Sequence, residues 1–319
     1  MLLNVENLSI SFDTFEGKVN VLDNVSFSID NGEILSIVGE SGSGKSVSAY
    51  SILGILDENS NVESGKILFE DTDLLKLNKK EIREYRGKKI GMVFQEPMTA
   101  LHPTMKVGKQ LLNVIIQNSG VSKEKAHEIM INNLKDVHFD NPDEIANKYP
   151  YELSGGMRQR IVISLAMSNE PKLLIADEPT TALDVTIQAE ILNLMKELVS
   201  KRNTAILLIT HDFSVVRSVS DKVCVMYGGK ILEKGNTDEV LKNPKNPYTA
   251  ALLNALPDKV DSNMRLQEIK GEVPDLRFRP KGCIFYSRCM KKGKICSQKV
   301  PTKKKISSDH FAYCWEVEK

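Results

Sequence analysis

The chain has 319 residues, of which 41% are hydrophobic and 27% are charged, an ordinary composition for a globular protein of about two domains. Its formal net charge of +1 favours no class of binding partner. The N-terminus lacks the basic stretch and apolar core of a signal peptide. No apolar run approaches the roughly 20 residues that span a bilayer, so we expect other chains to form any pore that this chain serves.

Short apolar runs organise the first part of the chain. The first 30 residues alternate apolar and polar positions, which predicts antiparallel strands. Further on, four near-continuous apolar runs predict strands buried on both faces, as in a parallel sheet. These runs are Ile34–Val38, Ile90–Phe94, Leu173–Ala176 and Ala205–Ile209. Each leads into a glycine or a polar residue, and we expect these residues to share the carboxyl edge of the sheet, where ligands bind.

The first of these runs leads into a glycine-rich loop that precedes a helical pattern, the context of a phosphate-binding loop. Its glycines let successive backbone N–H groups face one anion, and the helix start adds unpaired donors. Lys45 would supply charge at the β- and γ-phosphates of a nucleotide, and Ser46 a Mg²⁺ ligand. The predicted phosphate-binding residues are Gly39, Glu40, Ser41, Gly42, Ser43, Gly44, Lys45, Ser46 and Val47.

A second candidate anion site lies in a mostly helical stretch from Pro97 to Ala166, which interrupts the α/β pattern. Ser154 is a good N-cap for the helical run Ile161–Met167, and two glycines after it leave N–H groups uncovered. Taken alone, this motif would favour a simple capped helix. A second phosphate-facing helix start in the same chain favours the anion site.

Two adjacent carboxylates follow the run Leu173–Ala176. Asp177 can hold the water shell of a metal ion at the strand end. Because adjacent strand-end residues diverge, Glu178 can serve a water molecule, and our hypothesis is that it orients or deprotonates the attacking water. The alternative is that both carboxylates merely cap a loop, since acidic strand ends are common.

The chain changes character after a Pro- and Asn-rich stretch at Asn243–Pro247, which marks a boundary. Beyond it we expect one helix, Tyr248–Leu256, and an irregular basic tail. Between Arg277 and Lys305 lie eleven Lys or Arg and no acidic residue. A solvated basic face is the simplest interpretation; contact with anionic lipid or nucleic acid are the alternatives.

Four of the five cysteines crowd into this tail: Cys283, Cys289, Cys296 and Cys314. Without a signal peptide we expect a reducing compartment, which disfavours a disulfide framework. The spacing is not a common zinc pattern. Four thiols in a reducing compartment suit a [4Fe–4S] cluster or zinc, or they remain free.

With these motifs in view, the chain is identified as a member of the ABC-transporter ATPase subunits. The motifs that carry the resemblance are Gly39–Ser46 (Walker A), Gln95 (Q-loop), Leu153–Gln159 (signature), Leu173–Asp177 (Walker B), Ala182–Asp184 (D-loop) and His211 (switch histidine). Their order and spacing agree with the family across residues 1–235.

The resemblance implies that two such domains dimerise head to tail, with each ATP between the Walker A of one and the signature motif of the other. The signature residues that would meet the partner's ATP are Ser154, Gly155, Gly156, Met157 and Gln159. The implied Mg²⁺ ligands are Ser46, Gln95 and Asp177. Glu178, His211 and Gln95 would be catalytic, and Asp184 would belong to the D-loop. Phe12 most resembles the aromatic that stacks on adenine, with Phe15 or a plain strand aromatic as alternatives.

A closer resemblance links the chain to the oligopeptide/dipeptide importer branch. It is carried by Phe94–Pro103, Ala176–Gln188, Asn246–Leu253 and Gly271–Pro274. Met157 resembles the D-type subunit, and one departure is His102, where the branch often has Asn. The branch implies a heterodimer with a sister F-type subunit, two transmembrane permease subunits, an extracytoplasmic solute-binding protein and no nucleic acid. The chain would sit peripherally at the cytoplasmic face of the membrane. The cysteine tail also resembles this branch, which favours the [4Fe–4S] cluster over zinc.

We therefore expect an α/β fold: an ABC-type P-loop core with a mostly parallel sheet, an antiparallel β subdomain, a helical signature subdomain and a small C-terminal metal-binding tail. The expected domains are 1–242, with the helical subdomain at 97–170, and 243–319, the importer-type extension. The expected activity is hydrolysis of ATP to ADP and phosphate, coupled to peptide uptake. Nickel or another small solute is an alternative cargo.

A second class of alternative is a soluble ABC ATPase that acts on DNA or ribosomes. Such proteins usually carry two cassettes or long coiled coils, and this chain has neither. A non-catalytic regulatory subunit is a further alternative, which the intact Lys45, Glu178 and His211 argue against.

Overall fold

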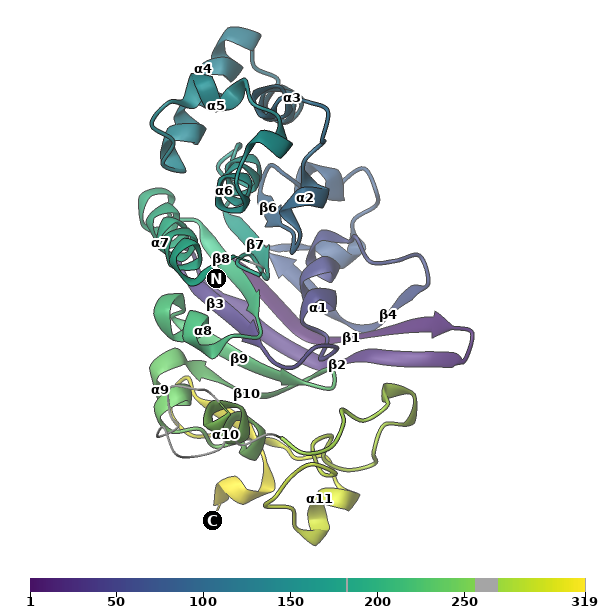
Figure 1. The fold of residues 1–319 in the computed structure, drawn as a ribbon. Helices are drawn as coiled ribbons and strands as arrows, with labels where there is room; N and C mark the ends of the chain where they lie inside the picture. Colours follow the sequence, from purple (N-terminus) through teal and green to yellow (C-terminus); the bar gives the residue numbers. More distant parts are fainter. Residues whose placement is uncertain (182, 256–268, 319) are drawn as a thin grey trace. The chain divides into compact units, whose positions relative to one another are not determined.

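The computed structural model describes residues 1–181, 183–255 and 269–318, whose contacts divide the chain into two compact units. Unit 1 comprises Met1–Leu2, Ile29–Ile34 and Lys76–Ile209; unit 2 comprises Leu3–Ser28, Leu35–Leu75 and Thr210–Lys319. Figure 1 labels most of the helices and strands of both units. Ala182 of the D-loop and Leu256, at the end of the helix expected from Tyr248, lie outside the described residues.

Unit 2 contains the expected antiparallel subdomain. Its strands lie in the order β2 (Gly17–Ile29), β1 (Leu3–Thr14), β4 (Ser60–Phe69) and β5 (Thr72–Asp73). Strands β1 and β4 pair antiparallel, with Leu3 opposite Phe69. Apolar residues of β1 and β2 are buried at alternating positions along much of each strand, as the sequence pattern predicts for strands with one face toward a core.

A second sheet in unit 2 is mixed. Its neighbouring strands are β11 (Lys303–Lys305), β12 (Phe311–Tyr313), β10 (Lys230–Asn236), β9 (Lys222–Tyr227) and β3 (Ile34–Val38). Strand β3 pairs parallel with β9, but β9 pairs antiparallel with β10. Gly228 and Gly229 join β9 to β10 with φ of 52° and 78°, a two-glycine hairpin turn that returns the chain antiparallel. The expectation of a mostly parallel sheet is therefore corrected to a mixed one.

In unit 1, the strands β6 (Ile90–Val93), β7 (Leu173–Asp177) and β8 (Ala205–Thr210) pair parallel and in that order. Every residue of β7 and β8 is buried, as predicted for strands covered on both faces. The helices are α2 (Pro97–Ala100), α3 (Val107–Ser119), α4 (Lys123–Asp136), α5 (Pro142–Ala146), α6 (Gly155–Ala166) and α7 (Val185–Arg202). The predicted helical character of Pro97–Ala166 is confirmed, with α3, α4 and α5 grouped beside α6 (Figure 1).

The remaining helices of unit 2 cover its sheets or belong to the tail. They are α1 (Lys45–Leu53), α8 (Phe213–Val219), α9 (Thr237–Lys242), α10 (Pro247–Asn254) and α11 (Lys294–Gln298). Short 3₁₀ turns occur at Leu74–Lys76, Ile82–Glu84, Pro150–Glu152, Leu276–Phe278 and Trp315–Glu318.

The tail is more ordered than the sequence indicated. Strand β12 pairs antiparallel with β10, with Glu233 opposite Ala312, so the tail widens the mixed sheet of unit 2. The sequence pattern missed β11 and β12 because each spans three residues, too few for a visible alternation. We use "C-terminal extension" below for the described residues from 243 onward.

A buried polar cluster ties the C-terminal extension to β10. Glu233 is 0% exposed and accepts hydrogen bonds from the backbone N–H groups of Lys245 at 2.7 Å and Asn246 at 3.0 Å. The Nε2 atom of His310, also buried, lies 2.7 Å from Glu233 Oε1. Because a buried carboxyl group without partners is costly, these contacts hold both ends of the extension against one strand.

We expect His310→Ala to lower the free energy of unfolding by about 1–3 kcal/mol, the cost of leaving a buried acceptor without one partner. Trp315, the single tryptophan, lies in the extension and donates to Lys299 O at 3.2 Å, so its fluorescence in a urea titration reports this region directly. His127→Ala, at an exposed position of α4, is the control and should change stability by less than about 0.5 kcal/mol. Equal unfolding midpoints for both variants would contradict the role of the cluster.

Candidate nucleotide-binding site

The glycine-rich loop joins the buried strand β3 to helix α1 in unit 2, as predicted. A Cβ atom on Gly39 would lie 2.1 Å from Met226 O, so the loop packs directly on the backbone of β9. Gly44, the N-cap of α1, has φ 101°, and a Cβ there would lie 2.7 Å from Leu22 Cδ2. Outside the loop, Gly229 N–H donates a hydrogen bond to Ser43 O at 2.9 Å. These contacts require glycine and fix the direction of the loop's N–H groups.

Lys45 begins α1 and turns back over the loop. Its Nζ donates to the carbonyl oxygens of Gly39 at 2.9 Å and Glu40 at 3.0 Å, and the residue is only 6% exposed. Ser46 and Val47 follow it on the first turn and are partly buried. Ser41 and Gly42 are exposed, and no heavy atom lies within 4 Å of a Cβ built on Gly42. The loop therefore has an open side at Ser41 and Gly42 and a lysine ammonium held close to its own backbone, a combination that suits a phosphate chain.

The two predicted catalytic side chains of unit 1 lie in contact with each other. Gln95, after β6, donates from Nε2 to Glu178 Oε2 at 3.2 Å, and Thr181 Oγ1 donates to the same oxygen at 3.0 Å. Asp177 ends β7 and is 1% exposed, whereas Glu178 is partly exposed and has φ 47°. Glu178 thus has a left-handed backbone, which is uncommon for a residue other than glycine, and its side chain is more exposed than that of Asp177.

The signature motif opens α6 as predicted. Ser154 is the N-cap, and its Oγ accepts from Met157 N–H at 3.3 Å. Its two glycines differ in their surroundings. A Cβ on Gly155 would lie 3.5 Å from Leu183, an ordinary contact, but a Cβ on Gly156 would lie 2.7 Å from Ile187 Cγ2. Gly156 is thus also required by the close packing of α6 against α7, a role that sequence spacing did not indicate.

Gln159, the last predicted residue of the signature motif, is buried. Its side chain is 1% exposed, and Nε2 has no hydrogen-bond partner among the described residues. The open part of the signature motif is instead a cavity of about 330 Å³, lined by Ser154, Gly156 and Met157 together with Arg160 and residues from the segment before α5 and from α5 itself. The predicted contact of Gln159 with a partner's nucleotide would require its side chain to leave the interior.

Three further predicted residues have partners or positions of their own. Asp184 is the N-cap of α7 and accepts from Ile187 N–H at 2.9 Å. His211 follows β8 and is exposed. Phe12 is half-buried on β1, opposite Ser60, whereas Phe15 is fully exposed at the β1–β2 turn. Because a half-buried ring keeps a fixed orientation, Phe12 suits stacking better than Phe15.

All four tail cysteines line one small cavity of about 20 Å³ in unit 2. Burial raises the pKa of the Cys283 thiol to about 11, and burial likewise raises the pKa of Cys289 and Cys314. Within the described parts of the chain, no three His, Cys, Asp or Glu side chains form a group that could hold a metal ion. The metal-binding tail expected from the sequence is therefore not shown, although its four thiols do lie together.

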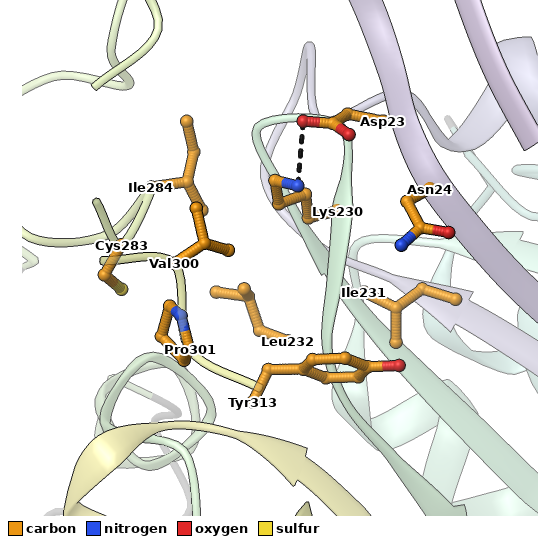
Figure 2. Close-up of a pocket in the computed structure, with 10 residues that line it drawn as sticks. All are labelled: Asp23, Asn24, Lys230, Ile231, Leu232, Cys283, Ile284, Val300, Pro301 and Tyr313. Carbon is orange, nitrogen blue, oxygen red and sulfur yellow. Dashed lines mark ion pairs between the residues drawn. The ribbon is translucent and has the colours of Figure 1, made fainter. Parts of the chain in front are cut away.

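A neighbouring cavity of about 80 Å³ is lined by residues of β10 and of the extension (Figure 2). Apolar side chains of the extension, among them Ile284, Val300 and Pro301, line it opposite Leu232 of β10. Lys230 pairs with Asp23 at 2.8 Å on its rim. None of the predicted nucleotide-binding residues lines this cavity, so we assign it to the packing of the extension.

Sequence comparison matches residues 22–181 to the family described as ABC transporter, and residues 232–296 to the oligopeptide/dipeptide transporter C-terminal region. Over 316 residues the chain is 48% identical to the oligopeptide transport ATP-binding protein OppD of Bacillus subtilis, which covers 98% of this chain and 88% of that protein. The chain belongs to the ATP-binding subunits of ABC transporters. It is also 45% identical to the dipeptide transport ATP-binding protein DppD of Bacillus subtilis, over 98% of this chain and 94% of that protein.

Solved ABC proteins share the fold of this ATP-binding subunit. The ATP-binding cassette MJ0796, solved as a dimer in a post-hydrolysis state with ADP and phosphate, aligns with a TM-score of 0.66 and 27% identity, covering 74% of this chain and 99% of that one. CbiO1 from Clostridium perfringens, part of the transporter complex cbiONQ, aligns with a TM-score of 0.66 and 30% identity over 76% of this chain and 91% of that one. The ABC-type P-loop fold and ATP binding, as predicted, are confirmed.

Among the residues described, no helix of this subunit combines the length and the apolarity that crossing a membrane requires. The residues that sequence reasoning overlooked are Tyr248, Arg288 and Ile187, all of which contact the predicted motifs from distant points in the chain. Local patterns placed Ile187 and Tyr248 in helices but could not indicate these contacts, because each contact joins segments that are far apart in sequence.

The two signature glycines offer a matched test. Gly156→Ala should lower the free energy of unfolding by up to about 2 kcal/mol, because overpacking against Ile187 costs about 1–3 kcal/mol and the better helix propensity of alanine returns about 1 kcal/mol. Gly155→Ala meets only an ordinary contact and should be neutral or stabilising by up to about 1 kcal/mol. Urea titrations of both variants check this; equal effects would show that the contact with α7 does not decide the residue.

Proposed function

We propose that this ATP-binding subunit hydrolyses ATP to drive the uptake of peptides by an ABC importer. The observation that carries the proposal is the similarity to OppD and DppD over nearly the whole chain, including the oligopeptide/dipeptide transporter C-terminal region. Both relatives carry peptide transport in their names. A generic cassette of about 240 residues would explain the nucleotide site but not the matched extension.

In this proposal the β- and γ-phosphates of ATP bind the N–H groups of Gly39–Ser46 and the ammonium of Lys45. Ser46, Gln95 and Asp177 would hold Mg²⁺, because a hydroxyl, a carboxamide and a buried carboxylate are the hard oxygen donors this ion prefers. The ion would neutralise charge on the phosphates. Phe12 would stack on adenine, with its ring held by its half-buried place on β1.

Glu178 would act on the attacking water as general base or orienting group. Its hydrogen bonds from Gln95 and Thr181 hold carboxylate oxygen Oε2 in place and so would fix the carboxylate for its action on a water molecule. Gln95 would thus contact the catalytic carboxylate as well as Mg²⁺. His211, exposed after β8, would contact the γ-phosphate. Asp184 would keep its capping bond to α7 and so place the D-loop at the dimer interface.

The signature motif would serve the ATP of a second subunit. Ser154, Gly155 and Gly156 carry the uncovered N–H groups of α6, and Met157 lines the adjoining cavity. The dimeric MJ0796 cassette supports a two-subunit site. We infer that the second subunit is a sister F-type chain, and that two permease subunits hold the pair at the cytoplasmic face of the membrane. An extracytoplasmic solute-binding protein would deliver the peptide.

We also propose that the chain has two domains. The first comprises residues 1–242, with a helical subdomain at 97–170, and the second comprises residues 243–319.

We infer that Cys283, Cys289, Cys296 and Cys314 hold a [4Fe–4S] cluster. The support is the donor set: four thiols on one cavity are what an iron–sulfur cluster or a zinc ion takes. Side-chain rotation would be needed to bring the four sulfur atoms to one centre. A bound cluster would crosslink a part of the extension that has only short elements of regular structure.

Glu178→Gln is the direct test of the catalytic assignment. Co-expressed with its permease and sister subunits and reconstituted in liposomes, the variant should lose ATP turnover and labelled-peptide uptake by more than about a hundredfold, the lower range for a general base. Its affinity for ATP should change by less than about threefold, because the phosphate loop is untouched. Full ATPase activity in this variant would refute the role of Glu178. ATP turnover by the wild type without peptide uptake would refute the proposal that the cargo is a peptide.

The cysteine assignment predicts iron and acid-labile sulfide in equal amounts after anaerobic purification, with a visible thiolate-to-iron absorption band. Cys289→Ser should reduce both contents sharply. Cys224→Ser is the matched control, because Cys224 is buried in β9 and does not line the cavity. Zinc in place of iron, or neither metal, would overturn the cluster.

A further inference from the structure

The C-terminal extension reaches the phosphate loop through one arginine. Arg288 donates from Nη1 to Glu40 Oε2 at 2.6 Å and from Nη2 to Glu40 Oε1 at 3.1 Å, a two-pronged pairing that matches guanidinium to carboxylate. The side chain of Arg288 is 6% exposed and that of Glu40 is 25% exposed. Little water competes for this pair, so it differs from the exposed ion pairs that contribute little to proteins.

Arg288 is itself held from several sides. It donates to the carbonyls of Ile269 at 2.9 Å and Lys270 at 3.2 Å, and to Tyr227 Oη at 3.3 Å. Burial acts to lower the pKa of Arg288, but the hydrogen bonds to Glu40 and Tyr227 outweigh it and raise the pKa above its ordinary value. The guanidinium therefore stays charged, and its fixed place sets where the Glu40 carboxylate lies.

Glu40 in turn shapes the part of the loop that serves phosphate. Its backbone N–H donates to Tyr248 Oη at 3.1 Å, and its carbonyl accepts from Lys45 Nζ at 3.0 Å. The side chain, N–H and carbonyl of this one residue are thus each bound by a different segment of unit 2. A shift of the Glu40 side chain would move the peptide that holds the phosphate-binding lysine.

The segment that precedes Arg288 in the chain is well packed. Phe285, three residues earlier, packs with Tyr227 and Tyr248, with ring centroids 4.6 to 5.2 Å apart within the trio. Ile284 and Cys283 line the cavity against Leu232 of β10 (Figure 2). Because aromatic packing of this kind leaves little freedom, the extension can act on the loop as a rigid support.

Charge gives the pair a second effect. ATP brings several negative charges to a loop that carries a carboxylate of its own, and a partly buried repulsion is screened only weakly by salt. Arg288 neutralises that carboxylate. Without the arginine, Glu40 would oppose nucleotide binding by its charge and would also lose the contact that orients its peptide.

We propose that Arg288 is a positioning residue of the ATP site, through which the C-terminal extension supports the phosphate loop and cancels the charge of Glu40. This inference rests on the proposed binding of ATP phosphates at Gly39–Ser46. It extends the nucleotide site to a segment 248 positions away in the chain.

The test measures Mg-ATP affinity of the full chain with a fluorescent ATP analogue. Arg288→Ala should weaken binding about tenfold, a size typical of residues that act through another group. Adding Glu40→Gln to Arg288→Ala should restore affinity to within about threefold of wild type, because the unpaired charge is removed. A purely structural role would predict no such rescue. Arg288→Lys keeps the positive charge but loses the two-pronged pairing with the carboxylate, so its affinity for ATP should lie between those of the wild type and Arg288→Ala.

Arg277→Ala is the matched control. Arg277 lies in the same extension and pairs with Asp275 and Glu16, neither of which belongs to the loop. This variant makes the same change in net charge and should bind ATP as the wild type does. In the assembled transporter, Arg288→Ala should raise KM for ATP with kcat within about twofold, the signature of lost ground-state binding.

Wild-type affinity in Arg288→Ala, or no rescue by Glu40→Gln, would overturn the inference. Failure of the wild type to bind Mg-ATP would instead overturn the proposed nucleotide site, so the two failures are distinguishable. Trp315 fluorescence establishes that each variant is folded. If Arg288→Ala is unfolded, Arg288→Gln replaces it, because glutamine retains most of the side-chain volume. Its affinity for ATP, measured alone and combined with Glu40→Gln, is then judged by the same criteria.

Discussion

The structure depends first on the packing of the phosphate loop against the end of β9. Gly39 approaches Met226 O so closely that no side chain fits between them, and Gly229 N–H holds Ser43 O from the other side. Unpaired backbone donors can bind an anion strongly only if they are oriented before it arrives, because ordering them afterwards costs conformational entropy. This packing supplies that order, and it explains why glycine is required where β3 ends and where α1 begins.

The C-terminal extension completes the surroundings of the loop rather than standing apart from it. Strand β12 extends the sheet that carries β9 and β10, and the Glu233 cluster fixes the start and the end of the extension to β10. Tyr248 and Arg288 then contact Glu40 from α10 and from the cysteine-rich segment. The phosphate loop and the extension accordingly belong to the same compact unit, although the composition of the chain changes at Asn243–Pro247.

In unit 1, several residues of the predicted motifs combine a role in the site with a role in local structure. Gly156 uncovers N–H groups at the start of α6 and lets α6 approach Ile187 of α7. Asp184, the predicted D-loop residue, also caps α7. Glu178 takes a left-handed backbone and accepts bonds from Gln95 and Thr181 on one oxygen. Gln159, in contrast, is buried, with a side chain that is 1% exposed.

The sequence by itself determined the parts of this protein that local chemistry controls. A buried apolar run, a glycine-rich turn and a helix start are neighbours in the chain, so the phosphate loop, the capped signature helix and the strand-end carboxylates could all be predicted from short patterns. Only the tertiary structure decided the mixed sheet, the burial of Gln159, the gathering of four cysteines on one cavity and the Arg288–Glu40 pair. The physical reason is that these depend on side chains brought together from distant parts of the chain by core packing, which no local period of residues records.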